Sequence, residues 1–335
     1  MNEGGDTSTA DPAARQIPFL RILVTGADGF VGSQLVIAMR GRMRPDARLF
    51  LTTRMPRSEW PADHDYVTFD LEDSHGIASA IAEVRPDLVV HLAAQSSVGQ
   101  SAVAAAATWS LNLCGSLALA RALATTVPDC TLLFVSSVEV YGLTFTHEIA
   151  TEASPLRPQS AYARSKAAAE AMFADVLPPQ AQLIVVRASN HSGPGQTDAF
   201  VIPAFADQIV RVEQGAASVI RVGNLEAERD FLDVRDVIAA YLELLVQAKT
   251  LPPRNVFNIA SGTSVRIGAI LDRLRALSPV ETVVQQDPQR MRASEIARAA
   301  VDATAIGRAI GWAPAHTLDD MLASVLADRR GRVSS

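Results

Sequence analysis

The segment Tyr162-Ala-Arg-Ser-Lys166 carries a phenol and an amine four residues apart. On a helix this spacing places both side chains on one face. A nearby ammonium can lower the pKa of a phenol from about 10 toward neutrality, and such a phenol can exchange a proton with a carbonyl or hydroxyl oxygen. Lysine is rare in this chain, because only Lys166 and Lys249 are lysines among the 30 Lys and Arg residues. Arginine lacks the compact three-donor head group of lysine, so a lysine at this position is a sign of function. The pair therefore predicts acid–base catalysis, and the alternative is a pair of exposed side chains on a helix.

Ser137 and Glu139 follow the predicted strand Thr131–Ser136. Ligands bind at the carboxyl ends of strands in open α/β sheets, so Ser137 is a candidate to hold the reacting oxygen beside Tyr162. If the strand continues, Glu139 faces the same side as Ser137 and is a candidate base. Ordinary turn chemistry is the alternative for the serine.

A glycine-rich turn, Gly26-Ala-Asp-Gly29-Phe-Val-Gly32, lies between an apolar strand and an amphipathic helix. Such a turn lets the backbone approach a pyrophosphate, which then lies on the amides of the helix N-terminus. In this context the turn predicts dinucleotide binding, whereas a packing role is the alternative.

The end of the second strand contacts the adenosine ribose in dinucleotide-binding folds, where an acidic residue selects NAD and an arginine accepts a 2′-phosphate. Here the sequence is Thr52-Thr53-Arg54. We therefore expect NADP(H), with NAD(H) left open and a surface arginine as the alternative. Asp70 and Leu71 end the next strand and are candidates to contact adenine, unless Asp70 is only a helix cap.

These residues need a scaffold of alternating strands and helices. Short apolar runs predict strands at Arg21–Thr25, Leu49–Thr53, Tyr66–Phe69, Leu88–Leu92, Thr131–Ser136 and Gln182–Arg187. Helical spacing separates most of them, at Ser33–Arg40, Ser74–Val84, Ala102–Thr126 and Ala161–Val176. The alternation predicts an α/β fold, a Rossmann-type doubly wound parallel sheet with a smaller C-terminal α/β substrate lobe.

The chain divides into a tail and two lobes. Residues 1–17 are mostly polar and predict a disordered tail. We expect the NADP-binding domain to cover 18–188 plus about 230–260, because a helix at Asp233–Ala248 and a strand at Asn255–Ile259 return to the first sheet. Residues 189–229 and 261–331 would form the substrate domain.

Composition excludes several classes of protein. The net charge of −6 argues against a nucleic-acid partner, and no apolar run reaches the roughly 18 residues that span a membrane. The two cysteines, Cys114 and Cys130, are too few for a disulfide framework and fit a reducing cytoplasm. The histidines lack the spacing of a helical metal site. We therefore expect a cytoplasmic protein with no metal and no membrane or nucleic-acid partner.

Together, several motifs resemble the extended short-chain dehydrogenase/reductases (the NAD-dependent epimerase/dehydratase family) that act on nucleotide sugars. They are Thr25–Gly32, His91-Leu-Ala-Ala94, Ser136–Gly142, Tyr162–Lys166 and Arg229–Asp233. Further strings resemble the branch that reduces GDP-4-keto-6-deoxy-D-mannose to GDP-D-rhamnose: Asn190–Gln196, Phe200–Pro203, Gly223–Phe231 and Arg290–Arg292.

The resemblance implies a role for each matching position. The catalytic set would be Ser137, Tyr162, Lys166, Glu139 and Asn112, the last completing a proton or water relay. The cofactor would contact Gly26, Gly29, Phe30, Val31, Gly32, Arg54, Asp70, Leu71, Leu92, Ala93, Ala94, Tyr162 and Lys166. The GDP-sugar would contact Ser97, Asn190, Val201, Arg229, Arg292 and Glu295. Ala293 stands where that branch has proline, which leaves the last two residues less constrained.

The family carries several reactions. The resemblance implies reduction of the C4 keto group to GDP-D-rhamnose or its C4 epimer, with Tyr162 as proton donor. A GDP-mannose 4,6-dehydratase is the alternative, although related dehydratases often have threonine at position 137 and lack the Gly193–Gln196 run. An epimerase/reductase is disfavoured because neither cysteine is near a motif. A catalytically silent NADP-binding protein is disfavoured because the catalytic set is intact. The family also implies a homodimer through a four-helix interface of Ala102–Thr126 and Ala161–Val176.

Overall fold

A seven-stranded parallel sheet forms the centre of the computed structural model, which describes residues 16–54, 65–291 and 296–333. Its strand order is β10-β6-β5-β4-β1-β2-β3, and every neighbouring pair is parallel. The strands are β1 (Arg21–Thr25), β2 (Arg48–Thr53), β3 (Asp65–Thr68), β4 (Leu88–His91), β5 (Thr131–Ser137), β6 (Gln182–Ala188) and β10 (Arg254–Ile259). The order reverses between β1 and β4, which is where a doubly wound sheet binds its ligand. The predicted Rossmann-type fold is confirmed.

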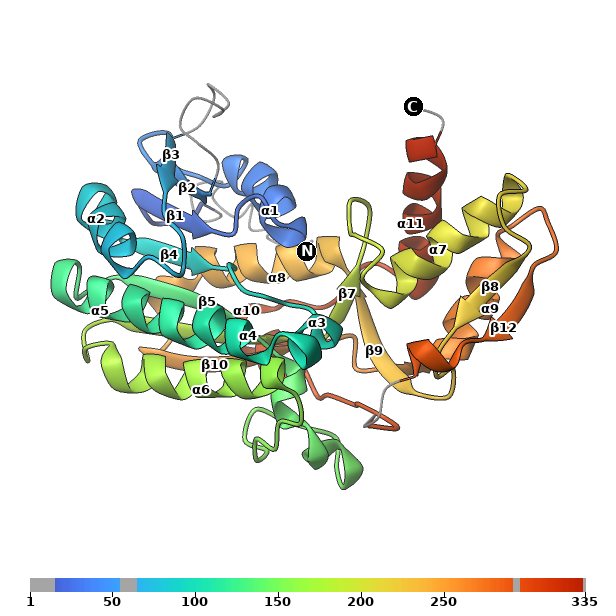
Figure 1. Cartoon of the computed structure of the whole chain (residues 1–335). Helices are drawn as coiled ribbons and strands as arrows, with labels where there is room; N and C mark the ends of the chain where they lie inside the picture. Colours follow the sequence, from blue (N-terminus) through green and yellow to red (C-terminus); the bar gives the residue numbers. More distant parts are fainter. Residues whose placement is uncertain (1–15, 55–64, 292–295, 334–335) are drawn as a thin grey trace, which may run out of the picture.

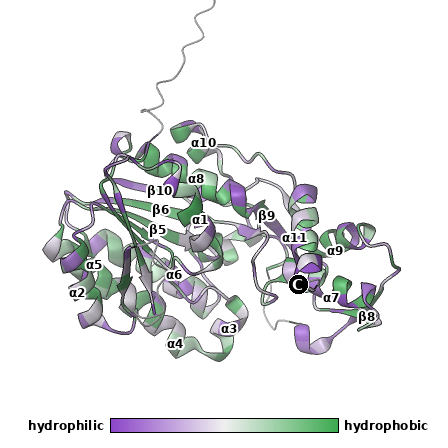
Figure 2. Cartoon of the chain, turned by 90° about the horizontal axis from the view of Figure 1, so that it is seen from above, coloured by the Kyte–Doolittle hydropathy of each residue, from purple (hydrophilic) through white to green (hydrophobic). Residues whose placement is uncertain are grey.

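Helices cover both faces of this sheet (Figure 1). One face packs against α1 (Phe30–Arg40), α8 (Val234–Val246) and α10 (Thr304–Ile310), and the other against α2 (Ser74–Val84), α5 (Ser116–Thr126) and α6 (Ala161–Val176). The strands are apolar almost throughout because both of their faces are buried, and Figure 2 shows the hydrophobic strands β5 and β6 between the helical layers.

The prediction of one helix over Ala102–Thr126 is wrong. The chain instead forms α3 (Val98–Val103), α4 (Ala105–Trp109), a π-helical turn at Ser110–Gly115 and then α5. Ala104 breaks the first helix with φ −130° and ψ 50°. Gly115 permits the π-helical turn to approach Leu71, because a Cβ there would lie 2.6 Å from the Leu71 carbonyl oxygen. The alanine-rich sequence favours helix throughout and carries no sign of this tertiary contact.

A second core lies outside the main sheet. It is built from α7 (Val201–Glu213), α9 (Ile267–Ala276) and α11 (Leu318–Val333), together with the parallel pair β8 (Val219–Val222) and β12 (Val283–Gln286). A three-stranded sheet of β11 (Ser264–Arg266), β9 (Glu228–Asp233) and β7 (Asn190–Ser192) lies beside it. The separate cores support the expected division into two lobes, whose limits stay a prediction.

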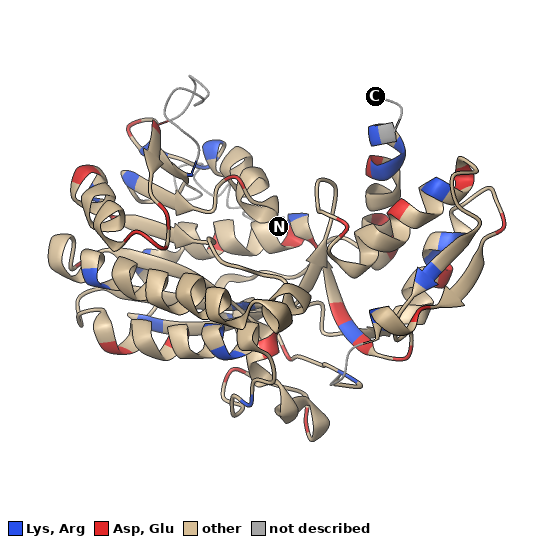
Figure 3. Ribbon diagram, in the orientation of Figure 1, with Lys and Arg blue, Asp and Glu red and all other residues tan. Residues whose placement is uncertain are grey.

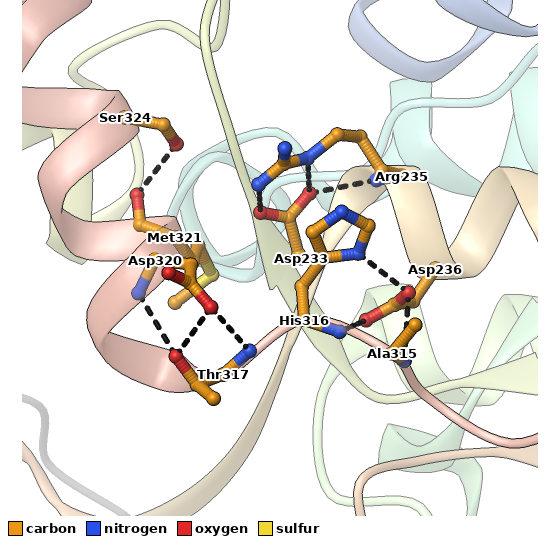
Figure 4. A network of polar contacts seen from close by, with 9 residues as sticks. All are labelled: Asp233, Arg235, Asp236, Ala315, His316, Thr317, Asp320, Met321 and Ser324. Carbon is orange, nitrogen blue, oxygen red and sulfur yellow. Dashed lines mark hydrogen bonds and ion pairs between the residues drawn. The ribbon is translucent and has the colours of Figure 1, made fainter.

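The chain passes between the two regions more than once. After β9 it forms α8 and then β10, which pairs in parallel with β6, so the expected return to the first sheet is confirmed. The carboxylate of Asp236 on α8 accepts hydrogen bonds from the backbone N–H groups of Ala315 and His316, at 3.1 and 3.0 Å, and contacts His316 Nδ1 at 2.8 Å (Figure 4). A buried carboxylate therefore fixes the segment that leads into α11.

Across the described ranges, no helix is long and apolar enough to cross a membrane. The same ranges contain no cluster of three or more His, Cys, Asp or Glu side chains suited to a metal ion.

Candidate active site

A cavity of about 950 Å³ runs along the carboxyl ends of the central strands. Its walls come from both regions of the molecule, since they include the glycine turn before α1, the ends of β2, β5 and β6, and parts of α7, β8 and β9. This is the position at which open α/β sheets hold their ligands.

The glycine turn forms one wall of the cavity. Gly26 has φ +69°, and a Cβ there would lie 2.8 Å from the Ala93 backbone nitrogen. A Cβ on Gly32 would collide with the Gly26 carbonyl oxygen. Gly29 caps α1 without a side chain, and the first turn of this helix carries no acidic residue. The turn therefore leaves amides and a positive helix end open toward a phosphate, so these residues fit a dinucleotide.

The predicted cofactor residues are all brought to this cavity. Its lining includes Gly26, Gly29, Phe30, Val31, Gly32, Arg54, Asp70, Leu71, Leu92, Ala93, Ala94, Tyr162 and Lys166. Arg54 is exposed and directly follows β2. Asp70 accepts a hydrogen bond from the Glu72 backbone N–H at 3.1 Å within the turn before α2. Asp73 is the N-cap of α2, so the helix-cap alternative for Asp70 is wrong.

Tyr162 lies in the first turn of α6, where the Ser160 side chain caps the helix. Burial raises the pKa of Tyr162 to about 12, a hydrogen bond with Ser137 acts in the opposite direction, and the charge of Glu139 raises it further. The prediction that Lys166 brings the phenol toward neutrality is wrong for this structure. At neutral pH the phenol keeps its proton.

Lys166 is buried one turn further along α6. Its Nζ donates to the Val135 carbonyl oxygen at 2.8 Å and lies 4.9 Å from the centroid of the Phe134 ring. Burial lowers the pKa of Lys166 to about 8, while the charge of Glu170 raises it. The ammonium is thus directed to the end of β5, which explains why it does not dominate the pKa of the phenol.

A buried ion pair supports the end of β5 from behind. Arg187 on β6 donates to Glu170 through Nε at 3.1 Å and Nη2 at 2.6 Å. Glu170 also accepts a hydrogen bond from the hydroxyl of Ser136. Arg187 donates to the Tyr141 hydroxyl at 2.9 Å as well. Since each partner is satisfied within the network, the network fixes the strand end that carries Ser137.

Glu139 does not continue β5. The strand ends at Ser137, and Val138–Tyr141 form a 3₁₀ turn whose Glu139 backbone N–H donates to Ser137 Oγ at 3.3 Å. The predicted strand geometry for Glu139 is therefore wrong, because the serine side chain caps the turn. Both residues nevertheless line the cavity.

Asn112 lies in the π-helical turn and is buried. Its side chain accepts from the Gln95 N–H at 2.8 Å and donates to the Gln95 carbonyl and to Ser165 Oγ, both at 3.0 Å. Asn112 is not among the residues that line the cavity, although Gln95 is. These bonds indicate that Asn112 positions the loop at Gln95, and its relay role stays a prediction.

At the other end, the cavity wall includes Ser97, Asn190, Val201 and Arg229. Arg292 and Glu295 lie outside the described residues, so their predicted roles stay predictions. Arg229 donates to the backbone oxygens of Glu228 and Ile296 at 2.8 and 2.7 Å. Figure 3 shows acidic and basic residues following one another along β9, where Arg229 is placed.

Sequence reasoning missed several residues of this wall. Arg221 on β8 and Arg290 also line the cavity, and with Arg229 they give this end a positive character suited to phosphate. The sequence signal for Arg221 was weak because it is a single polar residue in a short apolar strand. His191 was missed as well; it stacks on Phe30 with ring centroids 6.2 Å apart.

Comparisons with known proteins agree with this geometry. The model of the GDP-mannose 4,6 dehydratase family matches residues 23–325. The GDP-6-deoxy-D-mannose reductase of Pseudomonas aeruginosa is 35% identical over 321 residues, covering 93% of this chain and 98% of the relative. The dTDP-glucose 4,6-dehydratase of Streptomyces griseus is 30% identical, covering 91% and 93%.

Two solved structures show the same fold over most of the chain. One is RMD from Pseudomonas aeruginosa complexed with NADPH, with a TM-score of 0.78, 33% identity and coverage of 93% and 99%. The other is a UDP-glucose 4-epimerase from Thermotoga maritima with UDP-glucose, with a TM-score of 0.79, 25% identity and coverage of 93% and 99%.

Proposed function

Because this chain belongs to the GDP-mannose 4,6 dehydratase family of extended short-chain, NAD(P)-dependent enzymes, we propose that it is an NADPH-dependent reductase. Its substrate is GDP-4-keto-6-deoxy-D-mannose and its product is GDP-D-rhamnose or the C4 epimer. The reductase relative matches along 98% of its own length, and its structural counterpart is complexed with NADPH.

The observation that carries the proposal is the placement of Ser137, Tyr162 and Lys166 in the wall of one cavity. Reduction of a ketone to an alcohol needs a proton at the oxygen, and a phenol with a pKa of about 12 holds one at neutral pH. NADPH, when bound, supplies the hydride that reduces the carbonyl carbon. The Ser137 hydroxyl, which is hydrogen-bonded to the phenol, is placed to hold the C4 oxygen. The Lys166 ammonium stabilises the negative charge that Tyr162 carries after it has given up its proton.

The two nucleotides occupy different ends of the cavity. The glycine turn would hold the cofactor pyrophosphate, and Arg54 the 2′-phosphate. Arg221, Arg229 and Arg290 would face the diphosphate of the sugar nucleotide, since guanidinium groups bind phosphate through charge-assisted hydrogen bonds. Asn190 and Val201, which line the cavity together with Arg229, would contact the sugar.

A 4,6-dehydratase is the second candidate. One observation favours it, because Glu139 lines the cavity. A dehydratase needs a base for the C5 proton, and a carboxylate is suited to that role. It also needs Tyr162 to accept a proton in the first oxidation, however, and the raised pKa of the phenol opposes that step.

The expected homodimer is kept as part of this proposal. Helices α5 and α6 lie side by side on one face of the sheet, and small side chains such as Ala124, Ala168 and Ala171 are at least partly exposed there. Small residues let the helices of a second copy approach closely.

The direct test is product analysis. The purified chain is incubated with GDP-4-keto-6-deoxy-D-mannose and NADPH, and the nucleotide sugar is isolated for mass and NMR analysis. We expect a 6-deoxyhexose with a hydroxyl at C4 and unchanged configuration at C3 and C5. Inversion at C3 or C5 would instead indicate an epimerase.

A further inference from the structure

Two buried hydroxyl groups in the cavity wall have no hydrogen-bond partner among the residues that the structure describes. They are the phenol of Tyr241 on α8 and the hydroxyl of Ser189, the residue that follows β6. Tyr241 is 0% exposed and Ser189 is 2% exposed, and both residues line the cavity. A buried hydroxyl without a partner costs free energy, so these groups call for a ligand.

The backbone of Ser189 is already occupied. Its N–H donates to the Ile259 carbonyl oxygen at 2.8 Å, and its carbonyl oxygen contacts His191 Nδ1 at 2.9 Å. Within the described part of the chain, its side-chain hydroxyl has no hydrogen-bond partner. Tyr241 lies among apolar side chains of the core between the central sheet and α8. Burial raises the pKa of its phenol, which therefore keeps its proton. Each of the two hydroxyls can therefore donate or accept a hydrogen bond.

Both hydroxyls belong to the catalytic end of the cavity. Ser189 follows Ala188, which is the register partner of Ser137 in the β5–β6 pair. Tyr241 interacts electrostatically with Tyr162, and Tyr162 is hydrogen-bonded to Ser137. Any ligand that satisfies these hydroxyls therefore lies beside the reacting carbonyl.

We infer that Tyr241 and Ser189 bind the carboxamide of the nicotinamide ring, an inference that rests on the proposed NADPH-dependent function. The ring must reach this end because the hydride is transferred beside Tyr162. Its carboxamide has an oxygen that accepts hydrogen bonds and a nitrogen that donates them. Tyr241 donates to the amide oxygen and Ser189 accepts from the amide nitrogen, so the pair fixes the orientation of the ring.

The inference is tested by calorimetric binding of two ligands, NADP⁺ and 2′,5′-ADP. The second carries the adenosine and 2′-phosphate but no nicotinamide. We expect Tyr241→Phe to weaken NADP⁺ about three- to tenfold, the usual effect of one lost hydrogen bond, and to leave 2′,5′-ADP within twofold. Ser189→Ala should act in the same direction.

Tyr141→Phe is the matched control, because the Tyr141 hydroxyl is buried but bonded to Asn258 at 2.6 Å and to Arg187. This variant should melt at a lower temperature and bind both ligands as the wild type does. Tyr241→Phe should melt, without ligand, at the same temperature or higher, because no bond is lost.

Two outcomes overturn the inference: unchanged NADP⁺ affinity in Tyr241→Phe, or an equal loss for both ligands. If only the KM for the sugar nucleotide changed, the hydroxyls would belong to the substrate and the inference would be wrong. Failure of the wild-type chain to bind NADP⁺ at all would contradict the proposed function itself, so the two failures are distinguishable.

Discussion

We expect Arg54 to decide between the two nicotinamide cofactors. It is exposed at the end of β2 and lines the cavity wall, where a 2′-phosphate would be recognised. We expect Arg54→Ala to weaken NADPH by roughly tenfold or more, because a charge-assisted bond to phosphate is worth about 1.5–3 kcal/mol. NADH binding should change little.

Fluorescence titration with both cofactors checks this prediction. Arg121→Ala on α5 is the control, since Arg121 is exposed and is not among the cavity-lining residues. Equal losses of NADPH and NADH in Arg54→Ala would contradict the assignment.

Lys166 places a positive charge in a buried site at the expense of stability. Lys166→Met keeps an unbranched side chain, shorter by one atom, and removes the charge that burial disfavours. We expect the melting temperature to stay equal or rise, while turnover falls by roughly 10²-fold or more. In the wild type, the reductive rate should fall as pH rises through about 8, where Lys166 loses its proton.

Thermal melting and the pH dependence of turnover check the two parts of this prediction. The residual turnover of Lys166→Met should not fall as pH rises through about 8. A variant that keeps normal turnover would show that this lysine has only a structural role.

At the scale of elements, His91 joins three of them. It ends β4, its Nδ1 lies 2.7 Å from Thr25 Oγ1 on β1, and its Nε2 lies 3.1 Å from Ser116 Oγ on α5. Ser116 donates to the Asn112 carbonyl oxygen, so its hydroxyl accepts from Nε2–H. The neutral imidazole thus satisfies both contacts. Burial, aided by the charge of Lys166, lowers the pKa of His91 to about 3.

The consequence is acid instability. The unfolded histidine titrates near 6.5 and the folded one near 3, so the unfolded state binds more protons between these values and stability falls as pH falls. One such group contributes a slope of about 1.4 kcal/mol per pH unit. We expect His91→Gln to be less stable than the wild type at pH 7 but to lose stability less steeply below pH 6.

Denaturant unfolding at a series of pH values measures this slope. The exposed His75 on α2 provides the control, because His75→Gln should keep the full slope. An unchanged slope in His91→Gln would contradict the assigned cause.

How far the sequence predicts these elements depends on whether the signal is local. Periodicity predicted the parallel sheet, and spacing predicted that Tyr162 and Lys166 share a helix face, because strand burial and helical pitch are local. The π-helical turn at Ser110–Gly115 depends on the close approach of Gly115 to Leu71. The turn of Val138–Tyr141 depends on the hydrogen bond from the Glu139 backbone N–H to Ser137. The sequence displays neither contact. Tyr241 was missed for a similar reason: an aromatic residue in an apolar helix predicts core packing.

The electrostatics of the site depended still more on tertiary structure. The four-residue spacing predicted that Lys166 would lower the pKa of Tyr162. In the folded chain, burial has the larger effect, and the ammonium donates to the Val135 carbonyl. Desolvation depends on the whole surrounding core, so spacing alone could not give its size.

At the scale of the whole molecule, the cavity is shared between the two regions. The central sheet and its flanking helices contribute the proposed catalytic and cofactor residues, and α7, β8 and β9 contribute proposed substrate residues. The Asp236 contacts to Ala315 and His316 join α8 to the segment before α11 (Figure 4). Under the proposed function, the relative placement of the two regions would set how the sugar meets the nicotinamide.

The measurement that tests the central claim most directly is the stoichiometry of NADPH oxidation, followed by the absorbance of the reduced nicotinamide. With GDP-4-keto-6-deoxy-D-mannose, we predict one NADPH oxidised for each sugar reduced. With GDP-mannose alone, we predict no product. A dehydratase would return its hydride to the sugar, so 4-keto product from GDP-mannose without net change in the cofactor would contradict the account.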